Sequence, residues 1–528
     1  MATSTKKRVT PPGPPAEGFN HSAVVLLGIV AAIQVADPLL SSMALVRASA
    51  ELNFTASIQS LAAGISTLAL AATAIPGGML ADRLGRRGLL MVALLVGSAG
   101  QIITALSPDE TVYLVGRIVT GMALGIVFGA SYGMLRNVSA VKSLGPAMAT
   151  FNVLNGVVPV ISLVAGGVII STNWRLAYLM LPIVAVVCFI LIPLILPKVD
   201  RLPSTGRADI LGMVLLAVGV VGILYGVSMA THGLDSTKFW VPLVIAVLGL
   251  LFFWLREKRA SNPAFPIRLL AHPAFLGAVI MGIFWNVASA SASQMLPNVW
   301  QYVTHLQPSE IGVASLPQAA AGILGSVFAG MALGRGQKAR TIAIIGYALM
   351  TVAFVSYFFL PATAGYLLFV PGMVFAGCGW MMNATTQGNL FITLSPAKFY
   401  GPVTSSKMAV GQFGYSLGLS GSTVAVSSIT LAGVSKLTNG AVSGEGNWDA
   451  ITTYMADPSK VPTNEALAAV SSAQVQDAYM HAFGVTSLVI AAVVAIFGVV
   501  MYLLLRRKSA DIPTDVFLGL TPEATKNR

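Results

Sequence analysis

Charged residues are scarce in this chain. Asp, Glu, Lys and Arg make up only 9% of its 528 residues, whereas they form roughly a quarter of an ordinary soluble domain. Apolar residues make up 55% and fall in runs of about 20, the length that a helix needs to cross a membrane. The alternating segments of about ten residues that are typical of membrane β-barrels are absent. The composition therefore excludes a soluble domain and predicts an all-α polytopic membrane protein.

The scarcity of cysteine and the absence of several sequence motifs exclude further classes of function. Only two cysteines are present, Cys188 and Cys378, and both lie in apolar runs, which argues against a disulfide framework. No Cys or His cluster has the spacing of metal ligands, and there is no phosphate-binding loop. Residues 1–22 are polar and Pro-rich and lack the apolar core of a signal peptide, so we expect a disordered cytoplasmic tail. We expect no metal, no enzyme activity and no ATP-driven transport.

The apolar runs predict fourteen membrane-spanning helices in a 6+2+6 arrangement, with two helices inserted between two six-helix halves. The predicted domains are the tail at 1–22, an N-terminal half at 23–200, the inserted helices at 201–268, a C-terminal half at 269–506 and a cytoplasmic tail at 507–528. The predicted spans are about 23–46, 56–77, 88–106, 111–135, 146–170, 175–196, 209–230, 239–256, 273–297, 310–333, 341–360, 364–388, 406–433 and 481–505.

One external loop, at 432–480, is long. It is rich in Ser, Thr, Asn and Asp, with Trp448 and Tyr454 as its large aromatic residues. Long loops are usually functional or disordered. This one either has a gating or substrate-contacting role or is a passive, partly folded connector.

The basic residues predict the orientation. With the N-terminus inside, most of the 31 Lys and Arg residues fall on the cytoplasmic side, where such residues collect. The exceptions are Arg47, Arg175, Lys238, Lys436 and Lys460 on the outside, and Arg117 within a span. Both termini are therefore predicted to be cytoplasmic. The net charge of +12 reflects this orientation and does not indicate nucleic-acid binding.

The most informative segment is GGMLADRLGRRGLL, from Gly77 to Leu90. Its acid and three arginines cannot lie in hydrocarbon, so they mark a very short loop between the second and third spans. Asp82 can cap a helix N-terminus or pair with an arginine, while glycines let helix ends approach closely. The residues expected to act in conformational change are Gly78, Asp82, Arg83, Gly85, Arg86 and Arg87.

These residues, in this order, resemble the conserved loop between helices 2 and 3 of the major facilitator superfamily of transporters. Asp37 followed by Met43-Ala44-Leu45, and LVGRIVTGMALG (114–125), resemble motifs of its fourteen-helix drug:proton antiporter group. The segments 316–330 and 405–420 are also similar to that group, and FAGMALGRGQKAR (328–340) is a weaker copy of the loop. The resemblance implies the major facilitator fold and a proton gradient in place of a cofactor.

The fifth span departs from the antiporter motif Gly-Pro-x-x-Gly-Gly. Gly166-Gly167 is kept, but Ser162 and Leu163 occupy the first two positions and the proline lies earlier, at Pro159. Small residues and proline permit close helix contact and bending. The predicted hinge residues are Gly156, Pro159, Gly166 and Gly167, although close packing alone would also explain them.

Asp37 is the one acid clearly within a span, and Arg117 is a basic residue buried mid-span. Charges inside a membrane are by default functional or paired. A carboxylate that alternates between an apolar environment and a nearby cation can load and release a proton, so Asp37 is the predicted proton carrier. If the first and fourth spans are neighbours, as the resemblance implies, Arg117 can respond to its protonation. The alternatives are a permanently paired Asp37 and an Arg117 that only braces helix carbonyls.

Several polar or aromatic side chains within spans are expected to line a central substrate path. Membrane-embedded amides also serve simply in helix–helix contact, and tryptophans in ordinary packing. The candidates are Gln34, Asn152, Asn155, Trp285, Asn286, Gln294, Gln318, Trp380, Asn383 and Gln412.

The leading hypothesis is a proton-coupled exporter of lipophilic neutral or singly cationic small molecules, acting by alternating access. Its expected partners are such a substrate, protons and the lipid bilayer, with no nucleic acid, and we expect a monomer in a bacterial cytoplasmic (inner) membrane. Two alternatives stay open. The chain could transport a lipid or cell-envelope precursor, or it could be a membrane scaffold or sensor without transport.

Overall fold

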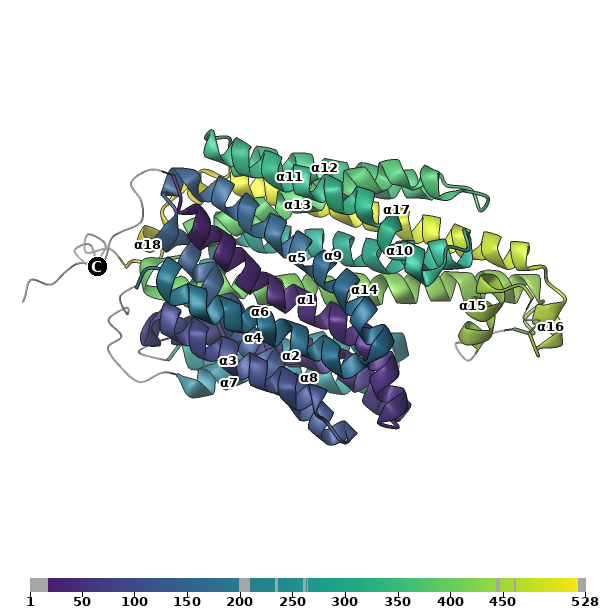
Figure 1. Ribbon diagram of the computed structural model, residues 1–528. Helices are drawn as coiled ribbons and strands as arrows, with labels where there is room; N and C mark the ends of the chain where they lie inside the picture. The colour runs from purple at the N-terminus through teal and green to yellow at the C-terminus, as the bar shows by residue number, and fades with distance from the viewer. Residues whose placement is uncertain are drawn as a thin grey trace, which may run out of the picture. The chain divides into compact units, whose positions relative to one another are not determined.

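The computed structural model describes residues 18–198, 209–232, 236–259, 263, 265–442, 447–459 and 462–520. Among these residues all regular elements are helices, and the one isolated β-bridge joins Phe19 to Ser139. Fourteen helices are long and apolar enough to cross a membrane, which confirms the predicted all-α fold (Figure 1).

The chain divides into two compact units. The first comprises Met1–Ala217, Arg256–Pro266 and Ser395–Met408, and the second comprises Val218–Leu255, Ile267–Leu394 and Ala409–Arg528. The first unit contains α1 (His21–Glu51), α2 (Ala56–Leu84), α3 (Arg86–Ala105), α4 (Glu110–Val138), α5 (Leu144–Thr172) and α6 (Trp174–Ile195). The second contains α8 (Thr237–Glu257, up to Leu255), α9 (Pro273–Tyr302), α10 (Pro308–Ala314), α11 (Leu316–Gly334), α12 (Ala339–Phe358), α13 (Val370–Thr393) and α17 (Ser472–Arg506). Two further helices, α7 (Ile210–Ser228) and α14 (Tyr400–Leu437), contribute to both units, as does α8 through Arg256 and Glu257.

In the first unit α4 packs against both α2 and α3, and α1 packs against α4, α5 and α6. The α3–α4 contact is reciprocal. A side chain added at Gly100 would meet Thr120, and one added at Gly116 would meet Thr104 and the Gly100 carbonyl. Small residues that let backbones approach closely are the usual basis of helix association in membranes. This contact places Arg117, the neighbour of Gly116, deep in the unit.

The second unit repeats this pattern of neighbours. Its central helix α13 packs against α11 and α12, as α4 packs against α2 and α3. In turn α9 packs against α13 and α17, as α1 packs against α4 and α6. Gly414 and Gly418 of α14 lie against the α9 backbone at Ile283 and Val287. The shared pattern supports the internal repeat suggested by the two copies of the loop motif.

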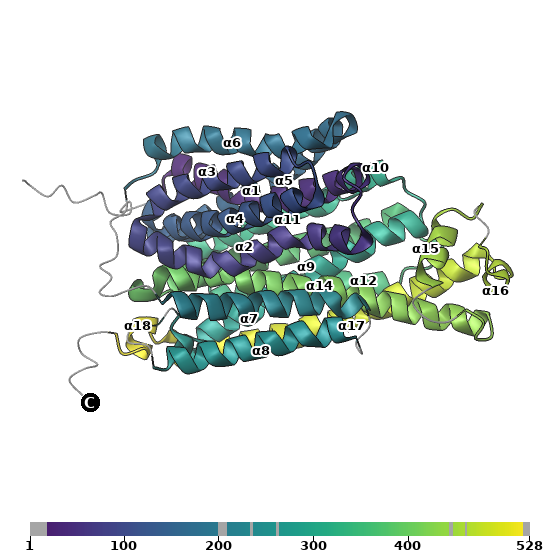
Figure 2. The same cartoon turned by 90° about the horizontal axis from the view of Figure 1, so that it is seen from below.

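The inserted helices α7 and α8 form a pair. Gly219, Gly222 and Gly226 lie on one face of α7, and side chains added there would meet Leu250, Ala246 and Leu243 of α8. Figure 2 shows the two helices running side by side.

Two expected loops are largely helical. Between Gly77 and Leu90 the only break is at Gly85, whose φ of 96° favours glycine, so α2 continues through Asp82 and Arg83. At 432–480, α14 extends to Leu437, α17 begins at Ser472, and α15 (Trp448–Ala456) and α16 (Glu465–Ala468) lie between them at the end of α17 away from α18 (Thr514–Phe517) (Figures 1 and 2). Tyr454 donates a hydrogen bond to the Val470 carbonyl at 3.1 Å. The described part of this segment is therefore a folded cap that buries apolar side chains, which polar composition did not indicate.

We predict that Gly116→Ala destabilises the protein. The added methyl group would lie 2.7 Å from the Thr104 amide nitrogen and 2.8 Å from the Gly100 carbonyl oxygen, so the backbones must separate, at a cost of about 1–3 kcal/mol. Thermal unfolding of the purified protein in detergent should show a lower midpoint. The matched control is Gly88→Ala, because nothing lies within 4 Å of the added methyl group. Equal midpoints for the two variants would contradict the proposed role of this contact.

Candidate functional site: a buried ion pair between α1 and α4

Asp37 of α1 and Arg117 of α4 form a bidentate ion pair in the first unit. Arg117 Nη1 donates to Asp37 Oδ1 at 2.8 Å, and Arg117 Nη2 donates to Oδ2 at 2.6 Å. Both side chains are only 1% exposed. Paired donors in this fork geometry are the strongest way for a guanidinium to hold a carboxylate. Sequence reasoning proposed both residues, and the structure brings them into direct contact.

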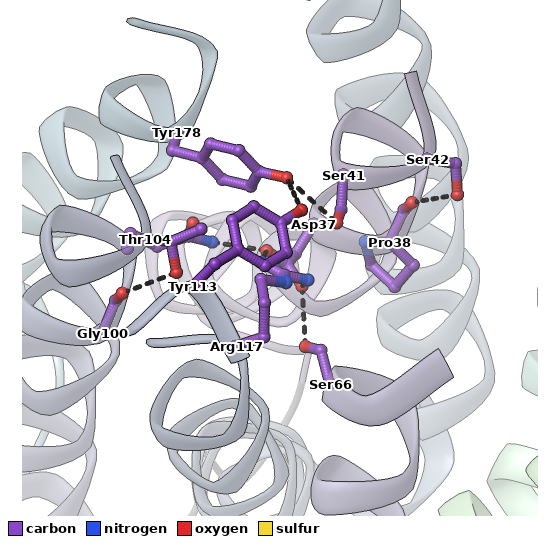
Figure 3. Close-up of polar contacts among 11 residues, drawn as sticks. Asp37, Pro38, Ser41, Ser42, Ser66, Gly100, Thr104, Tyr113, Arg117 and Tyr178 are labelled. Atoms are coloured by element: carbon purple, nitrogen blue, oxygen red, sulfur yellow. Dashed lines mark hydrogen bonds and ion pairs between the residues drawn. The ribbon is translucent and has the colours of Figure 1, made fainter. Parts of the chain in front are cut away.

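Two further donors complete the carboxylate's environment. Ser66 Oγ of α2 donates to Oδ2 at 3.0 Å, and Gln101 Nε2 of α3 donates to Oδ1. Side chains from four helices therefore meet at Asp37 (Figure 3). Neither Ser66 nor Gln101 was predicted, because a serine and a glutamine carry no distinctive signal until the fold places them beside a charge.

A tyrosine pair lies beside the arginine. The Arg117 guanidinium lies 5.5 Å from the centre of the Tyr178 ring. The Tyr178 hydroxyl is 2.6 Å from the Tyr113 hydroxyl and 3.2 Å from Ser41 Oγ (Figure 3). Tyr113, Tyr178 and Ser41 are all buried. These hydroxyls form a polar chain next to the ion pair, and sequence reasoning missed them.

The ion pair leaves some polar atoms unsatisfied. Arg117 Nε, Gln101 Oε1 and Thr120 Oγ1 are buried and have no hydrogen-bond partner among the described residues. Pro38 adds another local weakness, because a proline lacks the N–H that would bond the carbonyl of Gln34 one turn earlier. Such unsatisfied groups lower the cost of rearranging the site.

The α2–α3 motif builds a second buried cluster. Asp82 pairs with Arg86 and also accepts a hydrogen bond from the backbone nitrogen of Gly401, at 2.6 Å, in the first turn of α14. A carboxylate at a helix N-terminus is stabilised by the helix dipole. Asp82 therefore does both things expected of it, since it pairs with an arginine and caps a helix.

The other motif residues anchor this cluster. Arg87 donates to the carbonyls of Pro193 and Leu196 at the end of α6, at 2.9 and 3.2 Å. Gly133 of α4 leaves room for the Arg86 guanidinium, which lies 4.8 Å from the centre of the Tyr400 ring. Gly78 lies against the α14 backbone at Gly401, and Arg83 is partly buried near the end of α2.

The path candidates fall into two groups. Gln34 and Asn152 are buried in the first unit, where Asn155 is partly buried and donates to the Phe151 carbonyl at 2.8 Å. In the second unit Trp285 Nε1 donates to Gln387 Oε1 at 2.9 Å, and Asn286 donates to the Gly282 carbonyl at 2.7 Å. Both asparagine bonds are helix-internal. The remaining candidates in the second unit are Gln294, Gln318 and Gln412, which are partly buried, and Trp380 and Asn383, which are buried.

Gln387 of α13 was missed by sequence reasoning. It is 1% exposed, orients Trp285, and its Nε2 has no partner among the described residues. This neutral bond joins α9 to α13. In the pattern of neighbours these two helices correspond to α1 and α4, which the ion pair joins in the first unit.

The predicted hinge residues lie in α5. Pro159 lies within the helix, and a side chain at Gly166 would overlap Leu40 of α1. A side chain added at Gly167 would make an ordinary van der Waals contact with Met43, at 3.4 Å. Gly156 is partly buried. Close packing on α1 accounts for Gly166, and nothing in these contacts distinguishes a hinge from packing.

The Major Facilitator Superfamily family model matches residues 25–419 of this chain. The chain therefore belongs to the Major Facilitator Superfamily, which confirms the resemblance seen in the sequence. It is an integral membrane protein, with fourteen apolar helices in the part of the chain that the structure describes.

Two curated relatives are similar to this chain at low identity. The chain is 26% identical over 336 residues to the "Multidrug resistance protein B homolog" of Mycobacterium tuberculosis (strain CDC 1551 / Oshkosh), an alignment that covers 62% of this chain and only 62% of that relative. It is 24% identical over 438 residues to the "Quinolone resistance protein NorB" of Staphylococcus aureus (strain MRSA252), covering 81% of this chain and 92% of that protein.

A solved structure shows the same fold. A bacterial homologue of the human lysosomal transporter Spinster, in an inward-facing and unoccupied conformation, superposes with a TM-score of 0.54 at 12% identity. The superposition covers 93% of this chain and 98% of that one. At this identity the likeness establishes the major facilitator fold alone.

We predict that Asp37→Asn strongly destabilises the protein. The amide leaves Arg117 charged and buried without a counter-ion, and breaking a buried pair costs about 3–5 kcal/mol. Thermal unfolding in detergent should show a lower midpoint than the wild type, whereas Asp37→Leu combined with Arg117→Met should recover much of the loss, since an apolar pair leaves no charge unpaired.

The matched control is Glu51→Gln, which breaks the 2.9 Å ion pair with Arg175. Glu51 is 53% exposed, and exposed pairs contribute at most about 1 kcal/mol. If Asp37→Asn were as mild as Glu51→Gln, the ion pair would not be the buried structural element described above.

Proposed function

We propose that this protein is a proton-coupled exporter of lipophilic small molecules. The observation that carries the proposal is the Asp37 carboxylate, buried in a membrane-spanning helix and held by Arg117 in a bidentate pair. Ionisable groups within membranes commonly serve as proton relays. The relatives named for multidrug and quinolone resistance support a drug-like substrate.

Loading a proton onto Asp37 would break the ion pair. Arg117 cannot lose its own proton, so a neutral carboxyl leaves the guanidinium without its counter-ion. Ser66 can rotate its hydroxyl, and Gln101 can turn its amide, so that whichever of the two faces the protonated oxygen accepts from its O–H, while the other goes on donating to the second oxygen. The unpartnered Gln101 Oε1 is already an available acceptor. Protonation would thus release Arg117 while keeping the carboxyl hydrogen-bonded.

The Asp82 cluster would relay this change to the bundle. Asp82 holds the first turn of α14 through Gly401, and α14 from Ala409 onward belongs to the second unit. Alternating access in this fold requires one half to move against the other. Breaking and re-forming the Asp82–Gly401 contact would therefore couple motion of α2 and α3 to α14.

The orientation completes the proposal. The concentration of basic residues in the loops predicted to be cytoplasmic supports an orientation with both termini inside. Apolar spans with few charges suit lipophilic substrates. We propose export from a bacterial cytoplasm across the inner membrane, with inward proton movement as the driving reaction.

We predict substrate-dependent proton flux that requires Asp37. Purified protein in liposomes enclosing a pH-sensitive dye would face an imposed pH gradient and a panel of lipophilic anions, cations and neutral compounds. The wild type should couple proton movement to at least one compound, and Asp37→Asn should abolish that flux because the amide cannot carry a proton.

Glu51→Gln removes an exposed carboxylate from the same helix and should leave the flux unchanged. The purified Asp37→Asn protein must first be shown to be monodisperse, so that a loss of proton flux is not caused by unfolding of the variant. Unchanged flux in Asp37→Asn would exclude Asp37 as the proton carrier, and absence of flux with every compound would favour lipid transport or a non-transport role.

We also predict that Asp82→Asn slows transport without weakening substrate binding. The neutral side chain loses its charge interactions with Arg86 and with the N-terminus of α14. Turnover in proteoliposomes should fall about tenfold, a loss of about 1.4 kcal/mol of stabilisation, while equilibrium binding stays at the wild-type value. A parallel loss of binding would show that Asp82 acts on the substrate site itself.

A further inference from the structure

Lys407 is a cation inside a membrane-spanning helix. It lies in α14 within the candidate span Ala397–Leu437. Gly401, which bonds Asp82, lies six residues earlier, so Lys407 is about 9 Å further along the helix axis. Its side chain is partly buried. A charged side chain in this position is expected to have a counter-ion or a ligand.

The first unit offers Lys407 no counter-ion. The ion pairs among the described residues do not include it. Asp82 is occupied by Arg86 and by the Gly401 amide, and both oxygens of Asp37 are held by Arg117. The contact that Lys407 does make is with the Tyr132 ring, whose centre lies 5.2 Å from Nζ.

The ring beside Lys407, that of Tyr132, belongs to a cluster of three aromatic side chains. Tyr132 stacks on Phe128 with ring centres 5.3 Å apart and meets the Phe151 ring edge-on at 5.8 Å. All three rings are buried. A cation beside an aromatic ring can hold a ligand that has an apolar ring system and a negative charge.

Charge balance points the same way. The two buried pairs, Asp37–Arg117 and Asp82–Arg86, are each neutral overall, so neither offers free negative charge to a cationic substrate. Lys407 adds an uncompensated positive charge, and Arg136, which lies over the Tyr400 ring at 5.3 Å, adds another at the end of α4. The field within this unit therefore favours an anion over a cation.

We propose that Lys407 binds the anionic group of the transported substrate, and that the substrates are lipophilic acids such as aromatic carboxylates. This inference rests on the proposed transport function and names its substrate class. The ammonium would donate a hydrogen bond to the carboxylate while Tyr132 contacts the apolar part. The scarcity of acids in the sequence is compatible with singly cationic substrates, but this site disfavours lipophilic cations.

The test uses three tritiated probes that share one ring system: 2-naphthoate, neutral 2-naphthamide and cationic 2-naphthylmethylammonium. Binding to the full-length protein in phosphatidylcholine nanodiscs is measured by scintillation proximity, with empty nanodiscs as background. The wild type should bind naphthoate most tightly. Lys407→Gln should weaken naphthoate binding about tenfold or more, because a hydrogen bond to a charged group is lost, and should leave naphthamide unchanged.

Two variants control for folding and for general charge. Lys407→Arg keeps the cation and should retain the preference for naphthoate. Lys436→Gln makes the same substitution at the exposed far end of α14 and should bind all three probes as the wild type does. The proposal is overturned if the wild type does not prefer naphthoate, if Lys407→Gln keeps that preference, or if Lys436→Gln loses it equally.

Binding and transport separate this inference from the proposed function. Naphthoate binding that depends on Lys407, without proton-coupled flux, would leave the anion site standing and contradict the exporter. Proton-coupled flux of the cation or the amide, without Lys407-dependent naphthoate binding, would support the exporter and contradict the anion site.

Discussion

A guanidinium that cannot be neutralised lies at the centre of the first unit, and much of that unit follows from satisfying it. Arg117 in α4 requires an acceptor, which Asp37 of α1 supplies through both oxygens. The carboxylate in turn takes donors from α2 and α3 through Ser66 and Gln101. One buried charge therefore fixes the relative positions of four helices. Removing either Asp37 or Arg117 would destabilise the packing of these helices, because an unpaired charge in a membrane is costly.

Close packing is what allows those side chains to meet. The reciprocal contacts of Gly100 with Thr120 and of Gly116 with Thr104 bring α3 against α4, and Gly121 does the same for α2 and α4 at Ser66. In the second unit the corresponding neighbours α9 and α13 are joined by a neutral bond from Trp285 to Gln387. The two units thus share these helix contacts, which an ion pair joins in the first unit and a neutral hydrogen bond joins in the second.

The sequence predicted the number of spans, the family and the residues of both charge clusters, because charges in long apolar runs are conspicuous. It placed Asp82 in a loop, whereas α2 continues to Leu84 and the break is confined to Gly85; helix boundaries beside glycines are poorly determined by periodicity. It could not find Ser66, Gln101, Tyr178 or Gln387, since common polar residues gain significance only from what lies across a helix interface. The folded cap at α15 and α16 was hidden by its polar composition.

Lys407 shows how position changes the meaning of a residue. In the sequence it is one of several basic residues near a span end, and orientation explains it. In the structure α14 begins at Tyr400, so Lys407 lies two turns inside the helix beside a buried tyrosine. The ion pairs among the described residues all belong to the first unit, where Asp37 and Asp82 are each already matched by an arginine. A proton taken up at Asp37 would therefore add to a positive charge that Lys407 already contributes, and an anionic substrate would offset it. Proton loading and acid binding would then favour one another, whereas a cationic substrate would oppose protonation in the same unit.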